Sequence, residues 1–197
     1  LLSIGRLAIG IGMAGPLLTG FSQVINDWYD RDIDAINQPE RLIPSGKVSR
    51  RQVMWTIIVL AVLSMAVALF LAVVLPGLAA FGIVVAVLYS IPQVKLKRNG
   101  WVGNAAVGLA YEGLPWMAGH LAFAPLTTES LLLALIFSFG SHGIMTINDF
   151  KSVAGDRAMG IRSIPALYGE RNAAKLADIA ATLATFEVDV VNFIRNG

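Results

Sequence analysis

Four side chains with carboxylate or amide oxygens recur at helical intervals near the start of the chain. Asn26, Asp30 and Asp34 follow one another at steps of four residues, and Asp27 precedes Asp34 by seven. On a helix these steps place the side chains on one face, where like charges repel and a cation would relieve the repulsion. Oxygen ligands without His or Cys favour a hard ion such as Mg²⁺, or Mn²⁺ in its place. We therefore expect this acidic face to bind a divalent metal ion.

A second acidic cluster repeats the pattern further along the chain. Asn148 is followed by Asp149, and Asp156 comes seven residues after Asp149. A single acidic loop at a membrane surface is usually only solvated, but both clusters begin with Asn-Asp and both follow an apolar segment. This repetition favours a shared role. Metal binding is therefore also expected at Asp149 and Asp156, and the expected catalytic set is Asp30, Asp34, Asp149 and Asp156.

Basic residues are interleaved with the acidic ones. Guanidinium and ammonium groups are the usual partners of phosphate, and Mg²⁺ often completes its shell with substrate phosphate oxygens. Metal and base together can neutralise a diphosphate leaving group as its C–O bond breaks. We expect the two clusters to face each other across a helical bundle and hold a diphosphate between them. The side chains expected to contact it are Arg31, Arg41, Tyr89, Lys95, Lys97, Arg98, Lys151 and Arg157.

The composition limits the class of protein that positions these residues. Of the 197 residues, 56% are hydrophobic and only 14% are charged, against about 25% charged in a soluble domain. This excludes a soluble globular domain and a disordered chain. The absence of Cys excludes a disulfide scaffold, a thiolate metal site and a Cys nucleophile. A net charge of +2 is too small to indicate a nucleic-acid partner.

Long segments without charged residues predict membrane spans. A spanning helix needs about 20 mainly apolar residues. The segment 52–94 is long enough for two such helices, with a turn at Pro76-Gly77 between them. Five spans are expected, within residues 7–26, 52–94 (two spans), 100–122 and 130–148, and a weaker sixth over 176–194.

The distribution of Lys and Arg predicts the topology. Nearly all of them fall in residues 27–51, 95–98 and 149–175, whereas the turns near residues 76 and 120–128 have none. Alternation of basic and non-basic loops follows the positive-inside rule, which places both acidic clusters on the cytoplasmic side. We therefore expect an all-α polytopic bundle embedded in the lipid bilayer, with residues 1–197 forming a single transmembrane domain.

Two polar residues inside apolar segments have open interpretations. Glu112 lies within 100–122, where an ionisable side chain indicates a functional role by default, although a structural hydrogen bond explains it equally well. His142 lies between Gly140 and Gly143. A packed, hydrogen-bonded His is favoured there over a pigment or substrate ligand. Both residues are weak candidates for lining a pigment or substrate cavity.

Several sequence motifs resemble those of one protein family. Asn26-Asp27-x-x-Asp30-x-x-x-Asp34 resembles the first signature of the UbiA superfamily of intramembrane prenyltransferases, and YSIPQVKLKRNGW resembles the end of its third helix. NDWYDRDIDAIN with IPSG, and NDFKSVAGDRAMGIRSIP, are similar to words of the chlorophyll and bacteriochlorophyll synthases. YEGLPW and HGIMTINDFKS lean toward the bacteriochlorophyll branch. The similarity covers residues 10–180.

This resemblance implies a UbiA-type bundle, here without its terminal helices, in a chain that is a fragment with residues 184–197 atypical. It implies Mg²⁺-dependent transfer of a geranylgeranyl or phytyl group from its diphosphate to the propionate of chlorophyllide or bacteriochlorophyllide a, the last step of pigment synthesis. The implied setting is a bacterial inner or photosynthetic membrane, or a thylakoid for the chlorophyll branch, with the site on the cytoplasmic side. Pigment–protein assembly machinery is the implied partner.

Departures from the family pattern, of which Ala154 bears on the site, and two alternatives accompany this expectation. Ala154 stands where the synthases carry Glu, which removes one candidate carboxylate. One alternative is prenylation of a quinone or haem precursor. The motif NDFKSVAGDRAMG argues against it, because it is similar to the chlorophyll and bacteriochlorophyll synthases. The other is a non-catalytic membrane protein, either a pigment-binding assembly factor or a cation carrier. A carrier would place acidic residues in mid-membrane, but here they cluster at the ends of apolar segments. Mg²⁺-dependent turnover would separate the enzyme from the non-catalytic protein.

Overall fold

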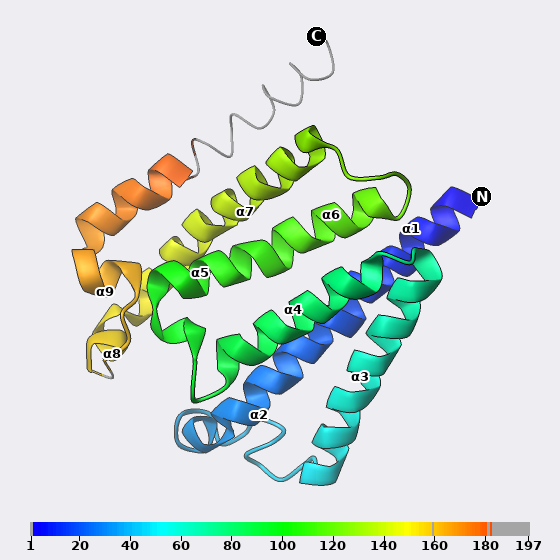
Figure 1. The fold of residues 1–197 in the computed structure, drawn as a ribbon. Coiled ribbons are helices and arrows are strands. Elements are labelled where there is room, and N and C mark those ends of the chain that lie inside the picture. The colour runs from blue at the N-terminus through cyan, green and yellow to red at the C-terminus, as the bar shows by residue number, and fades with distance from the viewer. Residues whose placement is uncertain (1, 159, 181, 183–197) are drawn as a thin grey trace. The chain divides into compact units, whose positions relative to one another are not determined.

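The chain is built from helices, as a computed structural model shows for residues 2–158, 160–180 and 182 (Figure 1). Within those residues there is no strand beyond one isolated bridge between Asn99 and Arg162. The all-α class is therefore confirmed. The elements are α1 (Leu2–Gly12), a π-helix (Met13–Thr19), α2 (Gly20–Asn37), α3 (Arg50–Leu71), α4 (Leu75–Ser90), a 3₁₀ turn (Leu96–Arg98), α5 (Gly100–Gly108), a π-helix (Leu109–Gly113), α6 (Leu114–Leu121), α7 (Thr128–Asn148), a 3₁₀ turn (Asp149–Ser152), α8 (Val153–Ala158), α9 (Ile164–Tyr168) and a helix over residues 170–180.

These elements form two compact units. The first contains Leu1–Lys95 with Leu121–Ala124, and the second contains Leu96–His120 with the chain from Pro125 onward. Each unit contains one of the two acidic clusters. The expectation of a single transmembrane domain over the whole chain stays a prediction.

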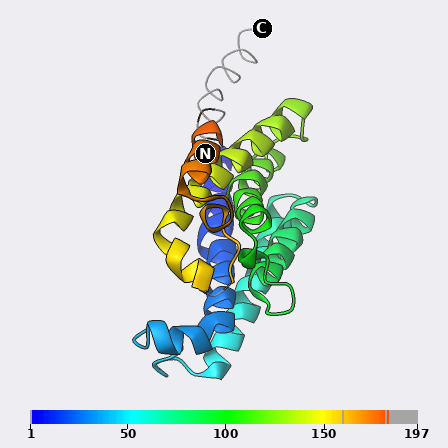
Figure 2. The ribbon, with the colours of Figure 1, turned by 90° about the vertical axis from the view of Figure 1, so that its left-hand side faces the viewer.

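In the first unit α2, α3 and α4 pack against one another (Figure 1). Phe21 and Ile25 of α2 are buried, as are Leu71 at the end of α3 and Leu75 at the start of α4. Ser49 begins α3 with a capping box, in which its hydroxyl accepts from the Gln52 N–H and the Gln52 side chain accepts from the Ser49 N–H. Figure 2 shows the end of α2 and the loop that follows it gathered beside the start of α3.

The turn between α3 and α4 lies earlier than predicted. The helices are separated at residues 72–74, not at Pro76-Gly77, and Pro76 lies in the first turn of α4. Proline is accepted there because the first N–H groups of a helix have no intrahelical partner and the ring already has a helical φ. Proline therefore starts this helix instead of interrupting the chain.

In the second unit α5 lies against α7, and small residues allow close approach. A Cβ added at Gly108 would collide with the Ser138 carbonyl oxygen of α7. The next helix, α6, also contacts α7, because the rings of Trp116 in α6 and Phe137 in α7 stack with centroids 4.4 Å apart. The start of α5 is tied to the segment before α9, because the Gly100 N–H donates to the Arg162 carbonyl at 2.8 Å.

Three helical runs of the described residues are long and apolar enough to cross a membrane: Ser3–Asp32, Arg50–Leu71 and Thr128–Ala158. They correspond to three of the five expected spans. The other two are present as helices, but α4 has only 16 residues, and the run from α5 to α6 is not among the three. The weaker candidate, 176–194, lies largely outside the described residues, as does the segment 184–197.

Two of the expected spans contain a π-helix that the hydropathy pattern does not indicate. One includes Pro16, and the other ends two residues before Pro115. Proline lacks an N–H and its ring clashes with the carbonyl four residues earlier. A wider turn is one way to relieve this clash without breaking the helix. The positions of both π-helices therefore follow from proline.

Candidate functional site

The first acidic cluster is organised by the length of α2. This helix continues to Asn37, so Asp27, Asp30 and Asp34 lie along one face of its last turns. The chain then folds back, with the Gln38 N–H bonded to the Asp34 carbonyl at 2.7 Å and the Arg41 N–H bonded to the Gln38 carbonyl at 3.1 Å. This turn brings the Arg41 side chain back to the acidic face.

Arg41 bridges two carboxylates of that face. Its Nη1 donates to Asp34 Oδ2 at 2.6 Å and to Asp27 Oδ1 at 3.2 Å. The hydrogen bond that Arg41 donates to Asp34 and the charge of Asp27 raise the pKa of Arg41 above its ordinary value. Only 12% of the Asp34 side chain is exposed, so its bond is the better shielded of the two. One guanidinium therefore supplies the countercharge for two residues of the expected metal site.

Asp30 has a second basic partner. Lys95 Nζ lies 3.6 Å from Asp30 Oδ1, and both side chains are largely buried. The Lys95 backbone has φ 43°, in the left-handed region that a residue with a side chain seldom adopts. Its N–H is bonded to the Ile91 carbonyl at 2.7 Å, which fixes the turn after α4. The turn thus holds a strained residue so that its ammonium group reaches α2, a combination typical of functional sites.

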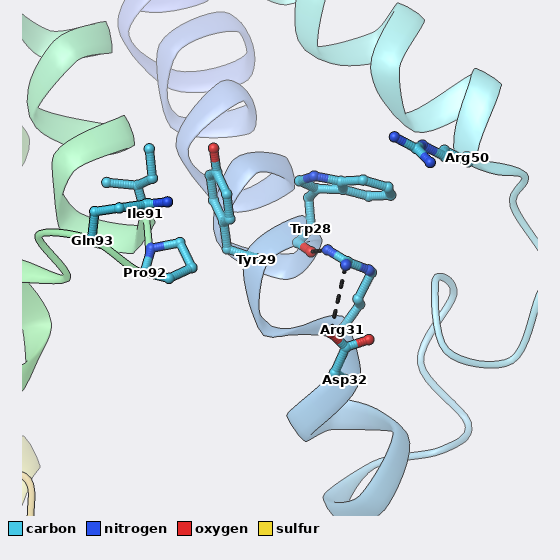
Figure 3. A pocket seen from close by; sticks show the side chains of 8 residues that line it. All are labelled: Trp28, Tyr29, Arg31, Asp32, Arg50, Ile91, Pro92 and Gln93. Carbon is cyan, nitrogen blue, oxygen red and sulfur yellow. Dashed lines mark hydrogen bonds and ion pairs between the residues drawn. The ribbon is translucent and has the colours of Figure 1, made fainter.

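The other residues that the sequence predicts for the site in this unit lie outside the ion pairs of Arg41 and Lys95. Asn26 and Tyr89 are half-buried on α2 and α4. Arg31 does not join the Arg41 cluster, because its guanidinium lies over the Trp28 ring at 4.4 Å from the centroid and donates to the Trp28 carbonyl at 2.7 Å (Figure 3). Arg31 therefore faces a pocket on another side of α2.

The second cluster belongs to the other unit and depends on neutral partners. Asp149 Oδ2 accepts from Asn104 Nδ2 at 3.2 Å, and the same amide lies 3.4 Å from Thr146 Oγ1. Asp156 is buried, and its Oδ2 accepts from Ser152 Oγ at 2.9 Å and from Ser163 Oγ at 2.6 Å. In the described part of the chain neither carboxylate has an ion pair. These two acids are thus held by hydrogen bonds from neutral side chains, and the charge of Lys151 acts on Asp149 only from beyond ion-pair distance.

The expected basic residues of this unit surround the acids less closely. Arg98, Lys151 and Arg157 are exposed, and none of these three forms an ion pair within the described residues. Lys97 is half-buried in the 3₁₀ turn before α5. That these four basic side chains contact the diphosphate of the substrate stays a prediction.

The two weak cavity candidates have distinct surroundings. Glu112 is exposed and lies within the π-helix Leu109–Gly113. His142 is half-buried, with its ring centroid 5.4 Å from that of Trp101 and 6.3 Å from that of Phe139. Trp101 in turn donates from Nε1 to the Tyr168 hydroxyl at 3.2 Å. His142 thus belongs to an aromatic group, in keeping with the packed role that its position favours.

The donor chemistry of each cluster fits a hard cation. The side chains offer carboxylate and amide oxygens, the ligands that Mg²⁺ prefers, and Asp30 Oδ1 is buried and already faces a positive charge. Across residues 2–158, 160–180 and 182, no three Asp, Glu, His or Cys side chains converge as a complete cage. Mg²⁺ seldom uses such a cage, because it is usually held by one or two carboxylates together with substrate phosphates.

Sequence reasoning missed the residues that orient the second cluster. Asn104 and Asp149 are 45 positions apart, and no local spacing links them. The signal for Asn104 was an amide inside an apolar helix, where a polar side chain needs a partner. Ser152 could have been found, because it precedes Asp156 by four residues on a helical turn. Ser163 carried no comparable signal.

The chain has relatives among known proteins. Residues 3–193 match the model of the UbiA prenyltransferase family. The chain is 53% identical over 192 residues to the bacteriochlorophyll synthase 34 kDa chain of Chloroflexus aurantiacus, an alignment that covers 98% of this chain and 61% of that protein. It is 46% identical over 168 residues to the chloroplastic chlorophyll synthase of Oryza sativa, with 82% and 45% covered. It therefore spans about half the length of these relatives, or somewhat more.

Two solved structures share the fold. One, from work on digeranylgeranylglyceryl phosphate synthase, has a TM-score of 0.75 at 24% identity and covers 98% of this chain and 72% of its own. The other is a UbiA homologue from Archaeoglobus fulgidus bound to DMAPP and Mg²⁺, with a TM-score of 0.73 at 17% identity and coverage of 97% and 75%. At these identities the likeness establishes the architecture alone.

Proposed function

The chain belongs to the UbiA prenyltransferase family, and from this membership we propose that it transfers a geranylgeranyl or phytyl group to the propionate of chlorophyllide a or bacteriochlorophyllide a. The observation that carries the proposal is the ordered charge pattern on α2, where Asp27 and Asp34 share Arg41 and Asp30 faces Lys95. Identities of 46–53% to a chlorophyll and a bacteriochlorophyll synthase support the choice of acceptor.

We propose that both acidic clusters bind divalent metal. The residues are Asn26, Asp27, Asp30 and Asp34 in the first unit and Asp149 and Asp156 in the second. When bound, Mg²⁺ supplies positive charge that stabilises the diphosphate as its bond to the prenyl carbon breaks. The Mg²⁺ held by the UbiA homologue from A. fulgidus supports this choice of ion, and Mn²⁺ has the same preference for oxygen ligands.

The basic side chains have a separate task in the proposed reaction. Arg41 and Lys95 lie among the carboxylates and present N–H donors on the acidic face. Such donors bind phosphate oxygens and stabilise the charge that develops on the leaving group. We propose that both cations turn from the carboxylates to the diphosphate when substrate binds.

The bond changes of the transfer are simple. The propionate carboxylate of the pigment attacks the allylic carbon, an ester C–O bond forms, and the C–O bond to diphosphate breaks. The attacking group is already ionised near neutral pH, so no general base is needed. The chain has to orient the two substrates, exclude water and neutralise the leaving group.

The setting follows from the apolar helices. This is an integral membrane protein, and within the described residues three helical runs are long and apolar enough to span the bilayer. We propose that both acidic clusters lie at its cytoplasmic surface, since the basic residues concentrate beside them. Transfer of the finished pigment to assembly proteins belongs to the same proposal, because an esterified chlorin is too apolar to leave through water.

Arg41 provides a prediction with two opposite readouts. Arg41→Ala should lower kcat about a hundredfold, because a donor to the leaving group is lost. The same change should raise the affinity of the free chain for Mn²⁺, because a competing cation is removed from Asp27 and Asp34. Paramagnetic resonance of free Mn²⁺ measures the affinity. Arg51→Ala, at an exposed Arg, is the matched control, and lower Mn²⁺ affinity in Arg41→Ala would contradict the bridging role.

The proposed function is tested by assay of membranes that contain the chain. Chlorophyllide a or bacteriochlorophyllide a is supplied with geranylgeranyl diphosphate, and the esterified pigment is measured by chromatography. EDTA should abolish the product and added Mg²⁺ should restore it. A chain that is folded and inserted but forms no ester with either pigment would overturn the proposal and favour a non-catalytic pigment-binding role.

A further inference from the structure

A pocket of about 390 Å³ lies in the first unit, on a different side of α2 from the acidic face. Its walls come from α2, from the first residue of α3 and from the segment after α4 (Figure 3). Trp28 follows Asp27 by one residue, and one residue on a helix is a rotation of about 100°. The lining residues are Trp28, Tyr29, Arg31, Asp32, Arg50, Ile91, Pro92 and Gln93.

The dominant feature of this pocket is a tryptophan between two guanidinium groups. The Arg31 guanidinium carbon lies 4.4 Å from the Trp28 ring centroid, and that of Arg50 lies at 5.6 Å. Figure 3 shows the indole reaching from α2 toward Arg50, with Arg31 beside it. Stacking holds both cations on the ring. Arg31 Nη1 donates to the Trp28 carbonyl and Nη2 lies 3.5 Å from the exposed Asp32 carboxylate, so an anion that binds here would compete with Asp32 for Arg31.

The charge of the pocket is not balanced by its own residues. Arg31 forms an ion pair with Asp32 at 3.5 Å, but 83% of the Asp32 side chain is exposed, so solvent weakens this pair. Within the described residues Arg50 has no ion pair. Two guanidiniums against one solvated carboxylate leave a net positive pocket.

The pocket lies at the ends of two apolar helical runs that are long enough to span a membrane. The run Ser3–Asp32 ends at Asp32, and the run Arg50–Leu71 begins at Arg50. Lipid headgroups occupy this level, and tryptophan side chains concentrate there. Basic pockets between spanning helices are typical binding places for acidic lipid headgroups. Ile91 and Pro92 add an apolar wall that can meet the first carbons of an acyl chain.

We propose that this pocket binds the phosphate of an anionic phospholipid. The planar guanidiniums of Arg31 and Arg50 suit the oxygens of a phosphodiester, Trp28 fixes both cations, and the apolar wall receives the start of the acyl chain. Inorganic phosphate shares the headgroup chemistry but lacks the chains. Arg31 is also among the side chains expected to contact the diphosphate, but none of the proposed metal ligands lines this pocket, so lipid binding is measured separately from prenyl transfer.

The test uses the full chain, purified in mild detergent, and native mass spectrometry to count retained lipids. The probes are phosphatidylglycerol and phosphatidylcholine with identical acyl chains, with and without inorganic phosphate. We expect the chain to retain one phosphatidylglycerol more firmly than phosphatidylcholine. The double variant Arg31→Ala/Arg50→Ala should bind it about tenfold more weakly, as expected from the loss of charge-assisted contacts.

Two further variants make the test decisive. Arg31→Lys/Arg50→Lys keeps the charge and should fold, but it should also bind more weakly, because an ammonium lacks the planar fork. Arg51→Ala removes the neighbouring charge, which does not line the pocket, and should retain the lipid. Displacement by millimolar phosphate would support the site with the free anion as its ligand. Equal retention of both lipids, or equal phosphatidylglycerol retention in all variants, would overturn the proposal.

Discussion

Asp30→Asn is expected to lower the rate of Mg²⁺-dependent prenyl transfer about a thousandfold, at the upper end of the effect of removing one electrostatic group from an active site. Asparagine keeps the shape of the side chain but removes its charge. The change takes one proposed ligand from the metal and leaves the largely buried ammonium of Lys95 without its carboxylate at 3.6 Å. Initial rates of pigment esterification, measured over a range of Mg²⁺ concentrations, provide the readout.

Glu40→Gln is the matched control for this prediction. Glu40 is exposed and lies in the loop after α2, close in sequence to the cluster but outside its face. Its neutralisation should leave the rate unchanged. An Asp30→Asn chain that melts at the temperature of the unmodified chain and turns over at the same rate would remove Asp30 from the proposed machinery.

Gly108→Ala is expected to destabilise the second unit by about 3 kcal/mol, the range seen when an atom is forced into a packed core. The added Cβ would collide with the Ser138 carbonyl oxygen, which belongs to the backbone of α7. A flexible side chain could move aside, but this oxygen moves only if the two helices separate. The melting temperature in detergent, followed by circular dichroism, measures the loss.

Gly119→Ala separates close approach from the general effect of a methyl group. Gly119 lies in the helical run that also contains Gly108, and an added Cβ there would meet nothing within 4 Å. Alanine is the better helix former by about 1 kcal/mol, so this variant should melt at the same or a higher temperature. Equal losses in both variants would show that the contact with α7 does not limit stability.

The shared helical face of the first acidic cluster was predictable from the sequence. Steps of four and seven residues place side chains on one helical face, and α2 continues far enough to realise that face for Asp27, Asp30 and Asp34. The return of Arg41 was not predictable in detail. It depends on the turn at Gln38, whose backbone bonds to Asp34 and Arg41 appear only in the folded chain.

The second cluster shows the limit of spacing arguments. A step of seven predicts that Asp149 and Asp156 share a face, but a 3₁₀ turn over Asp149–Ser152 intervenes, and the two acids take their hydrogen bonds from different partners. Asn104 comes from another helix. Such pairings depend on which helices pack together, which a periodic pattern leaves open.

The π-helices have a consequence for how the sequence of this family can change. Each wide turn holds about one residue more than an α-turn. A single-residue insertion in a helix normally rotates everything beyond it by about 100°, but a π-turn confines the surplus residue to one place. Deletion of one residue within Leu109–Gly113 would therefore convert the wide turn to an ordinary α-turn. The change of side-chain direction would stay within that turn. Length variation among relatives is therefore expected to concentrate at Met13–Thr19 and Leu109–Gly113, inside helices and not only in loops.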